Sequence, residues 1–175
     1  MRKSLRFLVA DIKEKARVVY DRDDAAGILK TLATDGTFAM VVYRLMQGSR
    51  ELGLAPLEMV FNKVNAAVGG CIIGRGAEFG PGFVLFHSNG IVINGKVRAG
   101  SSVHVFHQVT LGNDDTGEAP TLGSNVYIGA GAKVIGPVTV GDGARIGANA
   151  VVVHDVEPDT TVAGIPARPV RRRAK

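Results

Sequence analysis

The chain has 175 residues, of which 46% are hydrophobic and 21% charged, so it can build a packed core and is not a disordered polymer. The 23 glycines alongside only 7 prolines exclude collagen and a proline-rich linker and indicate many tight turns. A formal net charge of +5 favours anionic ligands, but the sequence has neither a basic helix interleaved with aromatics nor a zinc-finger spacing, which argues against nucleic acid. No run of 18 apolar residues occurs and the early FLVA run is too short for a signal peptide, so we expect a cytoplasmic protein with no membrane span.

The first 68 residues carry apolar residues at helical spacing and predict an N-terminal α-helical cap. The predicted helices are residues 3–20, a segment capped by Asp23 or Asp24, residues 37–50, and a segment from Pro56 to just before Gly69.

A six-residue repeat dominates the rest of the chain. An apolar residue occupies every sixth position, at Ile73, Phe79, Leu85, Ile91, Val97, Val103 and Val109, and after a break at Gly112–Pro120 again at Leu122, Ile128, Val134, Val140, Ile146 and Val152. Small or β-branched residues recur four places later, as at Ala77, Ser101 and Ala132. This pattern predicts a mainly β fold, a left-handed parallel β-helix of roughly five coils with about 18 residues each, over residues 69–168. We expect residues 169–175 to form a frayed basic tail.

Departures from a repeat mark candidate sites, and three of the four histidines fall where the repeat is interrupted by large or polar residues. His87 precedes a Ser88-Asn89-Gly90 turn, a suitable place for a general base, and histidine is the residue type that most often has this role. His107 follows 20 residues later, close to one coil, so the two side chains are expected to be neighbours. We expect packing roles for His104 and His107, a surface position for His154, and a buried, unreactive thiol at Cys71, the one cysteine.

The segments FHSNGIVI, QVTLG, YIGAGAKVIGPVTVGDGARIGANAVV and VAGIPAR, with RDDAAG and TFAMVVYRLMQ before them, resemble the bacterial serine acetyltransferase family over about Asp21 to Arg168. The resemblance implies a homotrimer with active sites between neighbouring β-helices, acetyl-CoA as co-substrate, no metal, and a small-molecule acceptor with a free hydroxyl. It also implies site residues: His87 as catalytic base, Asn113 in the loop at the thioester end, Gly112, Ala130, Ala148, Gly164 and Arg168 along coenzyme A, and Asp23 and Glu118 at the acceptor. Lys133, Arg145 and Arg168 are candidates to meet the phosphates of the coenzyme.

The chain departs from the family pattern in the acceptor half of the site. Ile72 stands where the family has the Asp that orients the catalytic His, and Phe86 replaces an acidic residue. The loop ends in Glu118-Ala119-Pro120 in place of Arg-His-Pro, which removes the natural carboxylate clamp. We therefore expect a neutral hydroxyl acceptor, such as a sugar in polysaccharide or lipopolysaccharide synthesis, with L-serine for cysteine biosynthesis as the alternative. Asp24, or a carboxylate of a neighbouring chain, could replace the missing Asp.

Two other classes of function stay open. A metal hydrolyase on the same fold would need three histidines converging on zinc, and the spacing of His104 and His107 is unlike that of γ-type carbonic anhydrases. A non-catalytic β-helix module would explain the lost Asp partner of His87.

Overall fold

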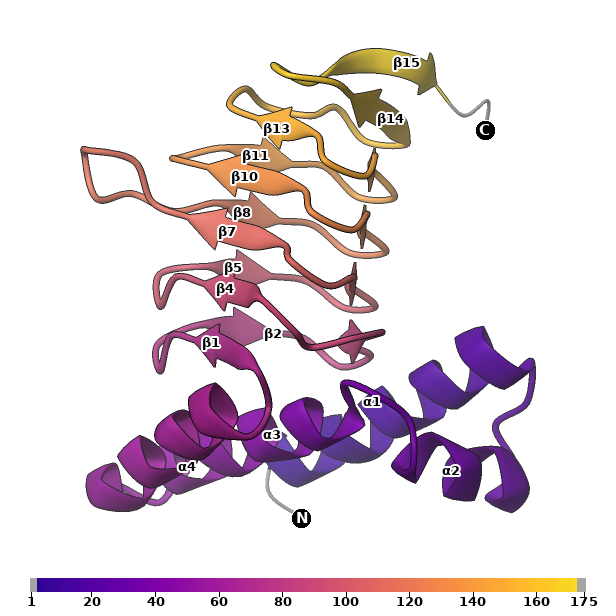
Figure 1. Ribbon diagram of the computed structural model, residues 1–175, viewed down its shortest axis with the longest axis vertical. Helices are drawn as coiled ribbons and strands as arrows, with labels where there is room; N and C mark the ends of the chain where they lie inside the picture. Colours follow the sequence, from indigo (N-terminus) through magenta and orange to yellow (C-terminus); the bar gives the residue numbers. More distant parts are fainter. Residues whose placement is uncertain (1–2, 173–175) are drawn as a thin grey trace.

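Four α-helices form a layer beneath a stack of parallel β coils in the computed structural model, which describes residues 3–172 (Figure 1). The helices are α1 (Lys3–Tyr20), α2 (Ala25–Leu32), α3 (Thr37–Glu51) and α4 (Ala55–Ala67). Asp24 caps α2 by accepting a hydrogen bond from the Gly27 N–H at 3.0 Å, and Pro56 lies in the first turn of α4. The predicted helical cap is therefore confirmed, with its four helices at the expected places.

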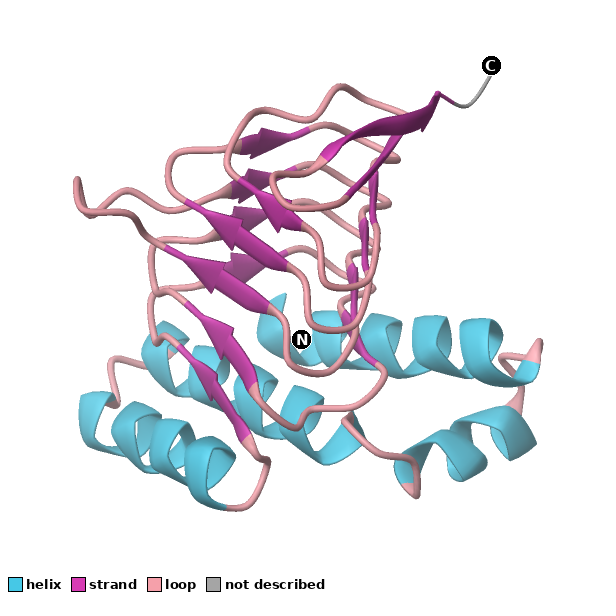
Figure 2. Ribbon diagram, turned by 45° about the horizontal axis from the view of Figure 1, so that its top comes forward, coloured by secondary structure: helices cyan, strands magenta, loops and turns pink. Residues whose placement is uncertain are grey.

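Three sheets form the sides of a triangular prism, and their short strands pair in parallel from coil to coil up to β14 (Figure 2). Sheet A contains β1 (Cys71–Ile73), β4 (Ile91–Ile93), β7 (Thr110–Gly112), β10 (Lys133–Ile135) and β13 (Val151–Val152). Sheet B contains β2 (Glu78–Phe79), β5 (Arg98–Ala99), β8 (Thr121–Leu122) and β11 (Thr139–Val140). Sheet C contains β3 (Val84–Leu85), β6 (His104–Val105), β9 (Tyr127–Ile128), β12 (Arg145–Ile146), β14 (Thr160–Ala163) and β15 (Arg168–Arg172). The expected parallel β-helix is present, and its core lies along the prism axis.

The repeat slips by two residues at the turn that contains His87. Ile73 pairs with Ile93, 20 residues on, whereas Lys133 pairs with Val151, 18 residues on. The expectation of one unbroken phase from Ile73 to Val109 was therefore wrong, and Ser101 does not occupy a buried corner. The pattern concealed the slip because residues two apart on a strand face the same side, so that Ile91 and Ile93 are both buried.

The second interruption of the repeat is the segment between β7 and β8, which projects from the stack (Figure 1). Thr110 pairs with Lys133, 23 residues on, so this coil has five residues more than the coil that follows it. The expected excursion at Gly112–Pro120 is therefore an external loop, and the coils above and below it stay in register.

Regular structure extends further toward the C-terminus than the basic composition of this segment suggested. β15 runs antiparallel to β14, with Thr160 opposite Arg172 and Ala163 opposite Arg168. The expectation of a frayed tail was wrong for residues 169–172, because the open edge of β14 supplies backbone partners for another strand. Residues 173–175 lie outside the described part of the chain.

A buried ion pair fastens the cap to the first coil. Arg44 of α3 donates from Nε to Asp11 Oδ2 of α1 at 2.7 Å, and the two side chains are 1% and 0% exposed. Asp11 also accepts hydrogen bonds from the backbone N–H groups of Gly82 and Phe83, at 2.8 and 2.9 Å. Burial raises the pKa of Asp11 to about 6, while Arg44 and the two backbone N–H donors oppose that rise and stabilise the carboxylate. The helices are thus held rigidly to the coil that carries His87.

Within residues 3–172 no single helix is both long and apolar enough to cross a membrane, and only the sharply bent α2–α3 pair reaches that threshold jointly, by length and composition alone.

Candidate functional site

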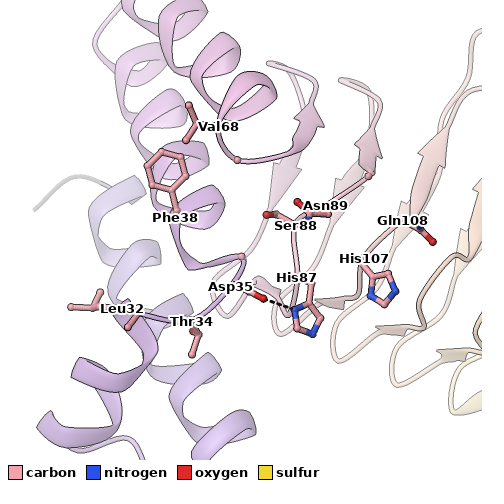
Figure 3. A pocket seen from close by; sticks show the side chains of 14 residues that line it. Leu32, Thr34, Asp35, Phe38, Val68, His87, Ser88, Asn89, His107 and Gln108 are labelled. Atoms are coloured by element: carbon pink, nitrogen blue, oxygen red, sulfur yellow. Dashed lines mark hydrogen bonds and ion pairs between the residues drawn. The ribbon is translucent and has the colours of Figure 1, made fainter.

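A pocket of about 840 Å³ opens where the cap meets the edge of the prism between sheets C and A (Figure 3). The cap lines it with the end of α2, the α2–α3 turn and the residues after α4, and the β-helix lines it with two stacked turns, β3–β4 and β6–β7. The lining residues are Leu32, Ala33, Thr34, Asp35, Gly36, Phe38, Val68, Gly69, His87, Ser88, Asn89, Gly90, His107 and Gln108. The pocket therefore forms at the turn where the repeat slips.

His87 lies in this pocket with an acidic partner from the cap. Its Nδ1 is 3.2 Å from Oδ2 of Asp35, which lies in the α2–α3 turn (Figure 3). Both side chains are open to solvent, and among the described residues none hydrogen-bonds to Nε2 of His87. Neutral imidazole that donates from Nδ1 keeps a lone pair on Nε2, which is the state a general base needs.

His107 is the neighbour of His87 along the prism edge, as the 20-residue spacing predicts. The two ring centroids are 5.8 Å apart with an interplanar angle of 71°. Nδ1 of His107 is buried and has no hydrogen-bond partner among the described residues. His107 also lines the pocket, and its packing role stays a prediction.

Lys15 of α1 joins the backbone beside Asp35 to the backbone beside His87. Its ammonium donates to the carbonyl of Asp35 and, at 2.7 Å, to the carbonyl of Leu85. Burial lowers the pKa of Lys15 to about 8. Gly36 follows Asp35 with a φ of 76°, and a Cβ there would clash with the Leu85 carbonyl. The α2–α3 turn is therefore seated tightly against β3.

Three positions assigned to coenzyme A by resemblance lie on the same edge of the prism as His87. Ala130 is in the turn from β9 to β10, Ala148 in the turn from β12 to β13, and Gly164 directly follows β14. Backbone hydrogen bonds link successive turns, from the N–H of Gly131 to His107 and from that of Asn149 to Ala130. The structure thus places these three positions on one line of stacked turns above the pocket.

The remaining loop residues lie on a different edge. Gly112 ends β7, and Asn113 and Glu118 belong to the external loop between sheets A and B. Asn113 accepts a hydrogen bond from the Asn94 side chain at 2.8 Å, and Glu118 lies 3.3 Å from the ammonium of Lys96. One chain by itself therefore does not bring Asn113 or Glu118 to His87.

Other expected site residues have local partners. Asp23 lies 3.4 Å from Arg17 at the α1–α2 junction and does not line the pocket. Asp24 is occupied as the cap of α2 and by its ion pair with Arg22, so the suggestion that it replaces the missing Asp was wrong. Ile72 lies half-exposed on β1, and Phe86 stacks on Phe106 with centroids 4.2 Å apart.

The basic residues proposed for the phosphates also differ in their surroundings. Lys133 donates to the carbonyls of Gln108 and Gly131, at 2.5 and 3.0 Å, and the guanidinium of Arg145 lies 4.0 Å from the ring centroid of Tyr127. Both are therefore engaged within the chain. Arg168 is exposed in β15, where its guanidinium bonds the neighbouring Ala167 carbonyl at 3.3 Å.

The remaining histidines and the cysteine lie where expected. His104 is largely buried 3.2 Å from Glu14 of α1, and burial lowers its pKa. His154 is exposed near the last coil. Cys71 is buried, and burial raises the pKa of its thiol to about 12. No three His, Cys, Asp or Glu side chains in the described part of the chain are grouped to hold a metal ion.

Sequence reasoning missed Asp35. It lies 52 residues before His87, in a short turn between helices, and the hexapeptide pattern does not extend to it. The available signal was the Asp35-Gly36 pair, because glycine after a helix often marks a tight turn.

Comparison with known proteins identifies the family. The family described as bacterial transferase hexapeptide (six repeats) matches residues 119–154. Serine acetyltransferase of Bacillus licheniformis is 36% identical over 169 residues, which cover 94% of this chain and 78% of that protein. Serine acetyltransferase of Synechococcus elongatus is 36% identical over 163 residues, and there the match covers 89% of this chain but 66% of the relative.

Solved structures agree with the sequence relatives. Neisseria gonorrhoeae serine acetyltransferase superposes with a TM-score of 0.86 at 33% identity, over 98% of this chain and 68% of that one. Soybean serine acetyltransferase complexed with serine superposes with a TM-score of 0.83 at 31% identity, over 96% of this chain and 70% of that one. With its stacked hexapeptide coils and a histidine in the pocket at their edge, the chain belongs to the serine acetyltransferase family of left-handed β-helix acyltransferases.

Proposed function

We propose that this protein is an acetyl-CoA-dependent O-acetyltransferase whose acceptor is the hydroxyl of L-serine. The observation that carries the proposal is the position of His87, with Nε2 unbonded among the described residues, in a pocket below Ala130, Ala148 and Gly164. Serine as acceptor is supported by the relatives, which are serine acetyltransferases in three bacterial genera and in soybean. None of these relatives is named for polysaccharide synthesis, so the comparisons favour the alternative acceptor over the sugar that we expected from the sequence.

In the proposed reaction, His87 takes the proton of the acceptor hydroxyl as its oxygen attacks the thioester carbonyl. A C–O bond forms and the C–S bond breaks. The proton on His87 then passes to the departing thiolate, which gives O-acetylserine and coenzyme A. Backbone N–H groups near Asn113 would stabilise the negative charge on the carbonyl oxygen during the attack.

The proposal requires a second chain. His87 and Asn113 lie on different edges of the prism, because the β3–β4 turn joins sheet C to sheet A and the external loop joins sheet A to sheet B. A homotrimer with cyclic symmetry can place the loop edge of one chain against the His87 edge of the next. We propose that each active site is shared in this way.

Lys96 weakens the electrostatic argument against serine. The negative charge of Glu118 opposes a carboxylate in the acceptor site, but the Lys96 ammonium lies 3.3 Å from it and also donates to the Gly117 carbonyl at 2.8 Å. The loop thus carries a cation that a carboxylate can approach. Because the pair is exposed, its net contribution to binding is small.

A sugar hydroxyl is the second candidate acceptor, and Phe86 favours it. Phe86 replaces an acidic residue beside His87 and stacks on Phe106, which contacts Tyr127 in turn. The three rings are half-buried and lie outside the pocket lining, and their exposed parts suit the apolar face of a sugar better than the ammonium and carboxylate of an amino acid.

The test is a free-thiol assay of coenzyme A release from acetyl-CoA, with L-serine in one reaction and neutral sugars or nucleotide sugars in others. Saturable release with serine, and a product of the mass of O-acetylserine, is the expected result. Release with a saccharide alone would refute serine and support the second candidate. Binding of acetyl-CoA with no release for any acceptor would refute an enzymatic function.

A further inference from the structure

We propose that Asp35, in the turn between α2 and α3, is the positioning residue of the catalytic base His87, an inference that rests on the proposed function. The family position for this role carries Ile72 in this chain, so a carboxylate must come from elsewhere if His87 is to be oriented. Asp35 is the carboxylate that the structure places on His87, with 3.2 Å between Oδ2 and Nδ1.

Asp35 acts on one ring nitrogen and leaves the other free. A carboxylate accepts a hydrogen bond from Nδ1–H, which fixes the imidazole in the tautomer with a lone pair on Nε2. When Nε2 accepts a proton during the attack, the imidazolium lies beside a negative charge, which stabilises it. Among the described residues, the Asp35 carboxylate makes no hydrogen bond other than the one with His87.

The backbone around this pair is fixed before substrate arrives. The buried ammonium of Lys15 bonds the carbonyls of Asp35 and Leu85, and Leu85 lies two residues before His87. Gly36 gives the turn a conformation and a closeness to β3 that a side chain would prevent. Asp35 and His87 therefore lie on two backbone segments that Lys15 links by hydrogen bonds. This link keeps the distance and orientation between the two side chains nearly constant.

The cap consequently takes part in orienting the catalytic base. Helices α2 and α3 present the α2–α3 turn to the pocket, and the buried Asp11–Arg44 pair joins α1 and α3 to the first coil. The helical region thus supplies the residue that positions His87, in place of a residue on β1.

The test compares Asp35→Asn with the wild type. Asn keeps the shape of the side chain but can donate to Nδ1, which favours the tautomer with hydrogen on Nε2. We expect kcat for acetyl transfer to fall about 10- to 100-fold, less than the loss for a buried triad because this pair is exposed, with KM for acetyl-CoA unchanged. Asp35→Glu should restore part of the lost kcat. Glu157→Gln, which removes one exposed carboxylate near the last coil, should keep wild-type kcat.

A double-mutant cycle separates positioning from a general effect on folding. In the His87→Ala background, Asp35→Asn should cost less than 2-fold further, because the group it acts through is gone. A full additional loss in that background would overturn the inference.

Nitrogen-15 NMR of the imidazole gives a readout that does not need turnover. Wild-type His87 should show hydrogen on Nδ1, and Asp35→Asn should shift the signals toward the other tautomer. An unchanged tautomer together with full activity in Asp35→Asn would refute the role of Asp35 while leaving the proposed function intact. A wild type without transferase activity would refute the proposed function instead, and the tautomer would still report whether Asp35 orients His87.

Discussion

Removal of Asp11 should destabilise the protein more than a typical single substitution. The Asp11 carboxylate is fully buried and accepts from the Arg44 Nε and Nη2 atoms at 2.7 and 3.1 Å, and from Gly82 and Phe83 at 2.8 and 2.9 Å. In Asp11→Ala the Arg44 guanidinium remains buried without its counter-ion, although it keeps bonds to the carbonyls of Phe79 and Gly80. Breaking a buried pair in this way costs about 3–5 kcal/mol.

The measurement is equilibrium urea unfolding at pH 7 and fixed protein concentration, because assembly would make the apparent stability concentration-dependent. For a chain of this length the loss corresponds to roughly 8–14 °C in Tm. The double variant Asp11→Leu/Arg44→Met should lose less than Asp11→Ala, because no unpaired charge is left inside. A loss below about 1 kcal/mol for Asp11→Ala, or a double variant as unstable as the sum of both single variants, would refute the reasoning.

Three further outcomes are expected. Burial lowers the pKa of Lys15 from 10.5 to about 8, so as the pH rises the folded chain loses this proton before the unfolded chain does. The free energy of unfolding of the wild type, relative to that of Lys15→Met, should therefore rise between pH 8 and 10.5. A difference that stays flat in a pH series of urea unfolding would contradict this. Gly36→Ala should lower both Tm and kcat, since its Cβ clashes with β3 beside His87, and an unchanged kcat would show that the turn does not control the pocket. The Cys71 thiol, whose pKa burial raises to about 12, should not react with a disulfide reagent at pH 8 until the protein is unfolded, whereas rapid reaction of the native protein would contradict its burial.

The sequence predicted most of the fold because each coil of a β-helix is specified by residues that lie close together in the chain. Each coil repeats the same inward and outward positions, so the stacking of residues such as Val134 and Val152 can be inferred directly from their spacing. The slip at His87–Gly90 escaped this reasoning because Ile91 and Ile93 are equally apolar and equally buried. Strand β15 escaped it because pairing with β14 depends on an open edge, which composition does not reveal.

The candidate site was predictable in part. His87 was found because it interrupts the repeat, and its approach to His107 followed from coil length. Asp35 was not found, because its contact with His87 joins two parts of the chain that follow different periodicities. Asn113 and Glu118 lie on another edge, so their place in a site depends on assembly between chains.

The most direct test of the central claim is the rate of coenzyme A release from acetyl-CoA and L-serine by wild type and by His87→Ala. The expected result is turnover by the wild type and a loss of about 10²- to 10⁴-fold in kcat for a folded His87→Ala protein. A His87→Ala enzyme with the wild-type rate would contradict the account, because no general base would then reside in the pocket beside Asp35.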